Sequence, residues 1–147
     1  MFKHILLPTD GSKLSDDAMR LGVQLAKTVN AKVTGFYVMP EFHVLTYKTE
    51  MLEDTKREFA KDSEVHAAQY LNVIETAAKA AGVPCDIASA TDDNPYEAII
   101  EFAKQRACDL IVMASHGRKG VQAVLLGSET QKVLTYSHIP VLVCRPH

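Results

Sequence analysis

A continuous apolar run, Leu110 to Ala114, constrains the fold of this chain more than any other feature. A strand without a polar face must be covered on both sides, as in a parallel sheet between two layers of helices. Polar residues begin where the run ends, with Ser115, His116 and Gly117. Open α/β sheets bind their ligands beyond the carboxyl ends of the strands. The sequence therefore predicts a ligand site directly after this strand.

A helix is expected to begin farther along the chain, at Gly127-Ser128. Ser128 is expected to be the N-cap, with Gln131 completing a capping box at the third helical position. The unpaired N–H groups and the positive dipole end of such a helix attract an anion. The sequence therefore predicts that a phosphate binds at this helix N-terminus.

Strands and helices are expected to alternate along the whole chain. Apolar or β-branched segments predict strands at His4–Leu7, Lys32–Met39, Cys85–Ala90, Leu110–Ala114 and Val141–Cys144. This alternation indicates a single α/β domain over residues 1–147, built on an open five-stranded parallel sheet with helices on both faces.

Three further helices are predicted between these strands. The first is amphipathic, with apolar residues at Ala18, Leu21, Leu25 and Ala26. The second is long and carries its last apolar residue at Ala81, before the stop signals Gly82 and Pro84; the dense mixed charge of its first half is typical of a solvated face. The third has Asn94 as its N-cap, Pro95 in the first position and Glu97 completing a capping box, and ends at Arg106.

Composition and charge exclude several classes of protein. The net charge is −2 without a basic block, which argues against a nucleic-acid partner. No apolar stretch approaches the roughly 18 residues of a membrane span, so we expect a cytoplasmic protein without a membrane partner. The scattered cysteines Cys85, Cys108 and Cys144 predict buried thiols rather than a disulfide framework or a zinc site.

Two parts of the sequence resemble the universal stress protein family. Ala114-Ser115-His116-Gly117, nine residues and Gly127-Ser128 closely resemble its nucleotide-binding motif G-x-x-G-(nine residues)-G-[S/T], with Ala114 in place of the first glycine. Pro8-Thr9-Asp10 matches a Pro-x-Asp pattern of the same family. The resemblance extends from His4 to Arg145.

The resemblance implies a fold and a function. The fold is Rossmann-like, of the adenine nucleotide alpha-hydrolase-like type, with strand order 3-2-1-4-5, so the loops holding Asp10 and Gly117 converge at the ends of strands 1 and 4. The function is that of a stress-response regulator or sensor that binds an adenine nucleotide, ATP, with or without Mg²⁺. A homodimer is expected through the edge strand Val141–Cys144, and a regulatory protein partner is left unidentified.

The candidate site residues are found beside the strand ends and at the predicted helix start. They are Pro8, Thr9, Asp10, Val38, Met113, Ala114, Ser115, His116, Gly117, Gly127, Ser128 and Glu129.

For most of these residues the sequence allows two interpretations. Asp10 accepts hydrogen bonds from ribose hydroxyls, or it caps the next helix together with Ser12. Val38 and Met113 contact the base, or they are ordinary core residues. Gly117 is expected to adopt a positive φ and to let the backbone approach a phosphate. The Cβ of Ala114 presses against the ligand, or points into the sheet if φ is negative.

Motifs for efficient catalysis are missing from the sequence. It holds no P-loop, nucleophile elbow or H-E-x-x-H motif, and the adjacent side chains of Ser115 and His116 are expected to diverge rather than form a dyad. Arg118 and Lys119 either approach the phosphates or are simply solvated. Two alternatives to the nucleotide-binding reading stay open: a dimeric interaction module of the same fold that binds no nucleotide, and a weak ATPase.

Overall fold

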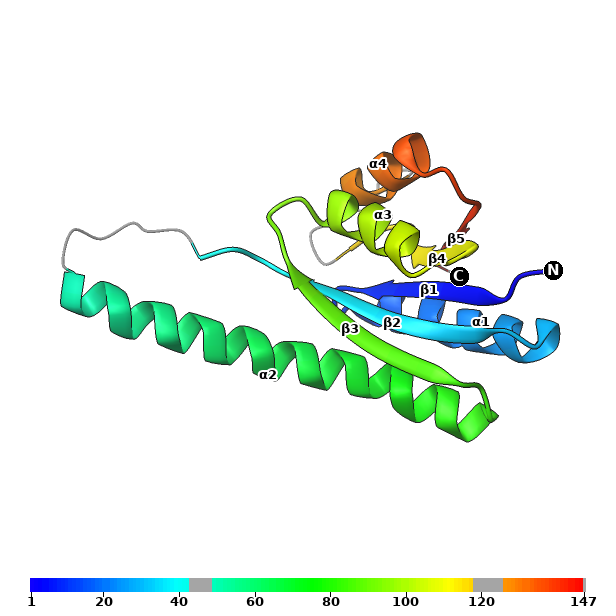
Figure 1. Cartoon of the computed structure of the whole chain (residues 1–147), viewed down its shortest axis with the longest axis horizontal. Coiled ribbons are helices and arrows are strands. Elements are labelled where there is room, and N and C mark those ends of the chain that lie inside the picture. The colour runs from blue at the N-terminus through cyan, green and yellow to red at the C-terminus, as the bar shows by residue number, and fades with distance from the viewer. Residues whose placement is uncertain (43–48, 118–125, 147) are drawn as a thin grey trace.

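In the computed structural model, strands and helices alternate along the chain, as the sequence predicts (Figure 1). The structure describes residues 1–42, 49–117 and 126–146, with side chains for all of these except 49–52. In chain order the elements are β1 (His4–Thr9), α1 (Lys13–Val29), β2 (Lys32–Met39), α2 (Thr49–Ala81), β3 (Cys85–Thr91), α3 (Pro95–Gln105), β4 (Leu110–Ala114), α4 (Ser128–Tyr136) and β5 (Val141–Cys144). The bounds of β2, β4 and β5 are those predicted, whereas β1 continues beyond Leu7 to Thr9.

The strands form one parallel sheet in the predicted order β3-β2-β1-β4-β5. β1 lies at the centre, and every residue in it is buried. Its residue Ile5 pairs with Val33 of β2 on one side and with Leu110 of β4 on the other. β2 and β3 are therefore added on one side of β1, and β4 and β5 on the other, so the strand order reverses between β1 and β4. This is the switch point of a Rossmann-like fold, where such sheets form their ligand crevice.

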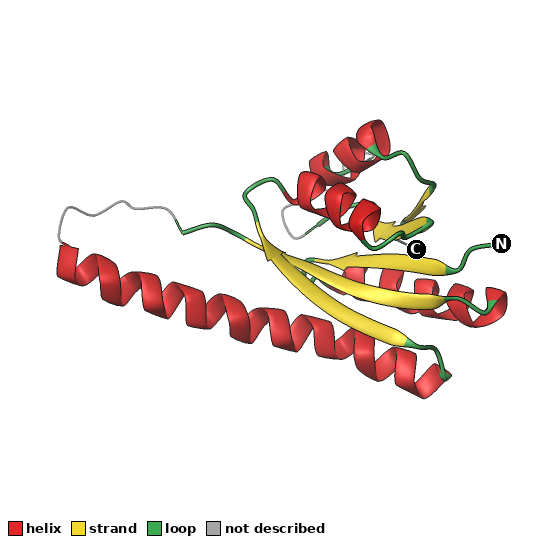
Figure 2. Ribbon diagram, in the orientation of Figure 1, coloured by secondary structure: helices red, strands yellow, loops and turns green. Residues whose placement is uncertain are grey.

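Helices cover both faces of the sheet, with α1 and α2 on one face and α3 and α4 on the other (Figures 1 and 2). Each layer has its own hydrophobic core. Under α1 and α2, the helix residues of the core are Met19, Val23, Ala26, Leu71, Ile74 and Ala78. Under α3 and α4, they are Ile99, Ala103 and Val133.

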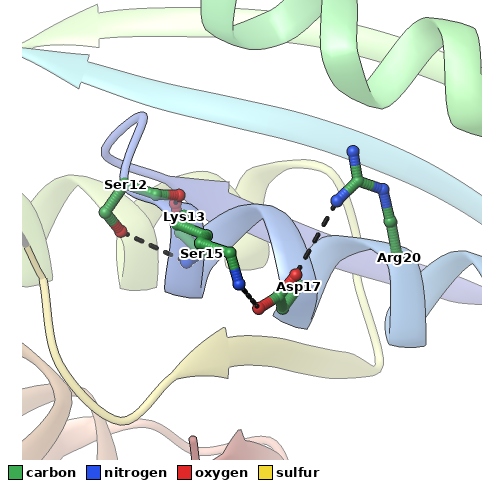
Figure 3. A network of polar contacts seen from close by, with 5 residues as sticks. All are labelled: Ser12, Lys13, Ser15, Asp17 and Arg20. Atoms are coloured by element: carbon green, nitrogen blue, oxygen red, sulfur yellow. Dashed lines mark hydrogen bonds and ion pairs between the residues drawn. The ribbon is translucent and has the colours of Figure 1, made fainter.

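The first turn of α1 holds the chain as it leaves β1. Ser12 is the N-cap, and its hydroxyl accepts the N–H of Ser15 at 3.2 Å (Figure 3). Asp17 forms ion pairs with Lys13 and Arg20 on the exposed face, and pairs of this kind contribute little to stability. Leu21 was predicted on the apolar face but is 45% exposed, because Gly22 and Val23 face the sheet instead.

The long helix α2 extends at its N-terminal end past the sheet (Figure 1). Its charged first half is largely exposed, as predicted, and Arg57 and Asp54 form an exposed ion pair there. The predicted stop is confirmed, because Gly82 follows Ala81 with a φ of +72°. Within the described ranges, no helix combines the length and the apolar character needed to cross a membrane.

All three cysteines are free thiols. Burial raises the pKa of the Cys85 and Cys108 thiols to about 11 and also raises the pKa of Cys144. The thiols are therefore protonated at neutral pH, which makes them poor nucleophiles.

Polar contacts join β1 to β4 at the amino end of the sheet. The carboxylate of Asp109 accepts the N–H groups of Lys3 and His4, at 2.8 and 3.0 Å. The buried ring of His4 contacts the Arg106 carbonyl through Nδ1 (3.1 Å) and the Thr34 hydroxyl through Nε2 (2.7 Å). A carbonyl only accepts, so we assign the proton of the neutral ring to Nδ1, and Nε2 accepts from Thr34.

The environment of His4 favours its neutral form. Burial lowers the pKa of His4 below its ordinary value of 6.5, and the Lys32 ammonium lowers it further. The Arg106 carbonyl and the carboxylates of Asp109 and Asp86 oppose this shift without reversing it. The unfolded chain takes up its proton near pH 6.5 and the folded chain only at lower pH. The contribution of His4 to stability is therefore complete above pH 6.5 and is lost as the pH falls toward the lowered pKa.

We predict that His4→Gln flattens the fall in the free energy of unfolding between pH 7 and pH 5, because the variant has no ring to protonate. Urea denaturation at several pH values measures this slope. His138→Gln, which replaces an exposed histidine, is the matched control and is expected to keep the wild-type slope. An unchanged slope in His4→Gln would contradict the assignment.

Candidate functional site

A cavity opens at the carboxyl ends of β1 and β4, and it also borders β2 and the N-termini of α3 and α4. It encloses about 570 Å³ of space between atoms, part of it open to solvent. Most of the predicted site residues line it: Pro8, Thr9, Asp10, Val38, Met113, Ala114, His116, Gly117 and Glu129. The lining also includes residues that the sequence reasoning missed: Ser15, Phe36, Pro95, Ile99 and Thr130.

Asp10 faces the cavity and also supports the start of α1. Its Oδ1 accepts the N–H of Ser12 at 2.9 Å and the hydroxyl of Ser15 at 3.1 Å. Ser12, not Asp10, is the N-cap, so the carboxylate is fixed beside the cap while its residue lines the cavity. A structural role at the start of α1 is therefore compatible with a role of Asp10 in binding a ligand.

The loops holding Asp10 and Gly117 converge, as the topology predicts. A Cβ built on Gly117 would lie 2.5 Å from Oδ2 of Asp10, which is closer than real side chains pack. The predicted positive φ at Gly117 is wrong, because the described glycines with positive φ are Gly11 and Gly82. A side chain at position 117 would have to displace the Asp10 carboxylate, so this neighbour, and not the backbone conformation, limits what position 117 can carry.

Ser115, the residue after β4, is hydrogen-bonded to both β5 and the start of α4. Its N–H donates to the Cys144 carbonyl at 2.8 Å, and its carbonyl accepts the N–H of Gly127 at 2.7 Å. Its hydroxyl lies 2.9 Å from Nδ1 of His116, so these adjacent side chains meet instead of diverging as predicted. Ser115 is fully buried and does not line the cavity, so its hydroxyl has a structural role here.

The N-terminus of α4 differs by one residue from the prediction. Gly127 is the N-cap, with extended backbone, and Ser128 is the first helical residue. Gln131 donates its N–H to the Gly127 carbonyl at 3.0 Å, and its side chain reaches the Leu126 carbonyl instead of forming a capping box. The N–H of Gly127 donates to the Ser115 carbonyl, which attaches this N-cap to the residue after β4.

This helix start presents backbone donors beside the cavity. The N–H groups of Ser128, Glu129 and Thr130 precede the first intrahelical hydrogen bond, so the helix itself provides no acceptor for them. Neither of the predicted site residues Gly127 and Ser128 lines the cavity. A Cβ built on Gly127 would lie only 3.3 Å from the Ser115 carbonyl oxygen. The chain is closely packed at this point, and the Arg118 and Lys119 charges lie outside the described residues.

A family model described as the universal stress protein family matches residues 1–145 of the chain. The chain belongs to the universal stress protein family. A universal stress protein of Methanocaldococcus jannaschii is 31% identical over 145 residues, which cover 99% of this chain and 83% of the relative.

Solved structures of other universal stress proteins have the same fold. The universal stress protein UspA from Lactobacillus plantarum superposes with a TM-score of 0.83 at 25% identity, covering 98% of both chains. A universal stress protein in complex with cAMP superposes with a TM-score of 0.72 at 25% identity, covering 97% of both chains.

In this universal stress protein, Ala114 occupies the position of the first motif glycine. Ala114 is the last residue of β4 and its φ is negative, so alanine is accommodated there without backbone strain. Its carbonyl accepts the Thr130 hydroxyl at 2.9 Å, which attaches the first turn of α4 to the end of β4. Ala114 lines the cavity, so this position at the end of β4 contributes to the cavity wall.

Glu129 joins the N-termini of α3 and α4. Its Oε2 accepts the N–H of Tyr96 at 2.9 Å, at the start of α3. Asn94 is the N-cap of α3 and Pro95 follows it, as predicted, but the Asn94 side chain makes no capping bond. The predicted capping box with Glu97 is also wrong, because Glu97 accepts the hydroxyl of Tyr96. Glu129 caps α3 from a different helix.

We predict that Glu129→Ala lowers the free energy of unfolding by about 1 kcal/mol, because α3 loses the acceptor at its N-terminus. Urea denaturation followed by circular dichroism measures the change. Glu129→Gln keeps an acceptor oxygen and should lose less. Glu75→Ala, at an exposed position of α2, is the control and should stay within about 0.5 kcal/mol of the wild type. Equal losses in Glu129→Ala and Glu75→Ala would contradict a capping role.

Proposed function

We propose that this universal stress protein binds an adenine nucleotide in the cavity at the carboxyl ends of β1 and β4, with ATP as the ligand, and acts as a stress-response regulator or sensor. One observation carries the proposal. A fixed carboxylate at Asp10, apolar walls at Val38 and Met113, and the donor groups at the start of α4 surround a single cavity. These are the groups that a sugar, a base and a phosphate require.

The cavity provides a surface for each part of the nucleotide. Val38, Met113 and the additional residues Phe36 and Ile99 offer an apolar lining suited to a purine. The Asp10 carboxylate accepts hydrogen bonds from the ribose hydroxyls in this proposal. The α4 N–H groups and the dipole of the helix attract the phosphates.

A structural relative supports the choice of an adenine nucleotide. The universal stress protein solved with cAMP covers nearly the whole of this chain at 25% identity. cAMP has the same adenine base as ATP, so the base surface proposed here serves either ligand. The 3′ oxygen of cAMP is esterified, so only its 2′-hydroxyl is free to donate to Asp10. The number of phosphates that the site prefers is a separate question, which titration with ATP, AMP and cAMP answers.

The carboxylates of the lining bear on Mg²⁺ and on hydrolysis. Asp10 and Glu129 line the same cavity, and either is suited to meet a Mg²⁺ that enters with the triphosphate. Glu129 is engaged with the Tyr96 N–H, and Oδ1 of Asp10 with Ser12 and Ser15. Carboxylates held in this way favour binding over rapid turnover. Phosphate release during the titration tests the alternative of a weak ATPase.

We predict that Gly127→Val abolishes nucleotide binding. Even a Cβ at this position lies 3.3 Å from the His116 Cα and the Ser115 carbonyl, so a branched side chain displaces the start of α4 from β4. Isothermal titration with ATP and Mg²⁺ measures the affinity, and circular dichroism checks the fold. Thr135→Val, at an exposed position of the same helix, is the control and should bind like the wild type.

Two results would contradict the proposal. A wild-type protein that takes up none of ATP, AMP or cAMP would favour the alternative of an interaction module. Retained affinity in Gly127→Val would place the nucleotide elsewhere. Ala114→Gly adds a direct comparison, because it restores the family motif at a position that lines the cavity.

We also propose that the regulator is a homodimer formed through β5. This strand is one edge of the sheet, and Leu142 on it is 40% exposed. An exposed apolar edge strand favours pairing with a second copy of the same strand.

We predict that Leu142→Lys gives monomers, because a desolvated ammonium group would oppose the pairing. Light scattering measures the mass of the particle. Ile87→Lys is the matched control, since Ile87 is 41% exposed on β3 at the opposite edge of the sheet. The dimer should survive in the control. A dimer that persists in Leu142→Lys, or that dissociates in Ile87→Lys instead, would refute the β5 interface.

A further inference from the structure

We infer that Tyr70 of α2 is a positioning residue for the Asp10 carboxylate and thereby sets the selectivity of the site for a ribose bearing free hydroxyls. The inference rests on the proposed function, in which Asp10 accepts hydrogen bonds from those hydroxyls. Tyr70 does not line the cavity. Its effect passes through Gly11, which directly follows Asp10 in the chain.

The ring of Tyr70 occupies the space where residue 11 would carry a side chain. A Cβ built on Gly11 would lie 2.3 Å from both Cε1 and Cζ of Tyr70. Gly11 has a φ of +80°, a conformation that favours glycine, and its N–H donates to the Thr9 hydroxyl at 3.0 Å. The loop after β1 therefore takes its shape with the Tyr70 ring against its backbone.

Neighbouring aromatic rings fix the position of Tyr70. Tyr37 of β2 meets it edge to face, with ring centroids 5.2 Å apart. His66, one turn earlier on α2, lies nearly parallel to it at 5.9 Å. Tyr37 pairs with Thr9 in the sheet, so the Tyr70 ring packs on β2 beside the last residue of β1. A ring held from two elements is a rigid support for the loop.

Asp10 is consequently restrained from three directions. Ser12 and Ser15 of the α1 start hold Oδ1, and Gly117 of the β4 loop closely approaches Oδ2. Tyr70 holds the backbone of the next residue from the α2 side. Without the ring, Gly11 gains space and has no side chain of its own to fill it. The carboxylate then loses the fixed orientation on which discrimination between sugars depends.

The test compares ATP with 2′,3′-dideoxy-ATP, which has the same base and phosphates but lacks both ribose hydroxyls. Titration calorimetry gives the ratio of the two dissociation constants. Wild type should prefer ATP by roughly tenfold or more, the usual effect of hydrogen bonds to a charged group. Tyr70→Ala should bring the ratio close to one and leave the affinity for the dideoxy nucleotide nearly unchanged.

Further variants separate positioning from general stability. Tyr70→Leu keeps part of the apolar volume but lacks the ring atoms that contact Gly11. It therefore gives the same test if Tyr70→Ala unfolds, and it should also lose the preference. Asp10→Asn should reduce the ratio, and combining it with Tyr70→Ala should reduce it no further. Phe59→Leu alters another aromatic residue of α2, whose ring centroid lies 5.4 Å from that of Phe42. This variant should keep the wild-type ratio of dissociation constants.

Failure of the inference is distinguishable from failure of the proposed function. If wild type prefers ATP and folded Tyr70→Ala or Tyr70→Leu keeps that preference, the inference is wrong while nucleotide binding stands. Equal wild-type affinity for the two nucleotides would also overturn it, because Asp10 would then not recognise the ribose. A wild-type protein that binds neither nucleotide would overturn both.

Discussion

The parallel pairing of β1 with β4 is the constraint on which the rest of the structure depends. It places the chain reversal of the sheet between these two strands, so that the loops after them leave side by side. Asp109 fixes the pairing at the amino end by accepting the Lys3 and His4 N–H groups. At the other end, the same pairing brings Asp10 against Gly117. A shift of one strand past the other would separate the two sides of the cavity.

Polar contacts around the cavity maintain its shape. Ser115 is wholly buried and binds the backbone of both Gly127 and Cys144, so it couples the start of α4 to the edge strand β5. Glu129 couples the same helix to α3 through the Tyr96 N–H. A nucleotide at the start of α4 would therefore meet a helix already attached to three other elements. In the proposed regulator, this attachment provides a physical route from the ligand to the surface of β5.

The two faces of the sheet contribute differently to the site. α3 and α4 border the cavity from one face, and on the opposite face, which α1 and α2 cover (Figure 1), Ser15 of α1 also lines it. Through Tyr70, α2 nevertheless reaches the backbone next to Asp10. Because the N-terminal part of α2 extends past the sheet, one element carries both an exposed charged surface and a contact behind the site.

The sequence by itself determined the strands, the alternation with helices and, through the family motif, the strand order and the convergence of Asp10 with Gly117. Continuous apolar runs and loop residues adjacent in the chain carry that information. Tertiary structure alone decided contacts between distant segments. The Ser115 carbonyl accepts the N–H of Gly127, the residue that caps α4 in place of Ser128, and the Tyr70 ring lies against the loop after β1. No local pattern encodes such contacts, because each depends on how the helices pack over the finished sheet.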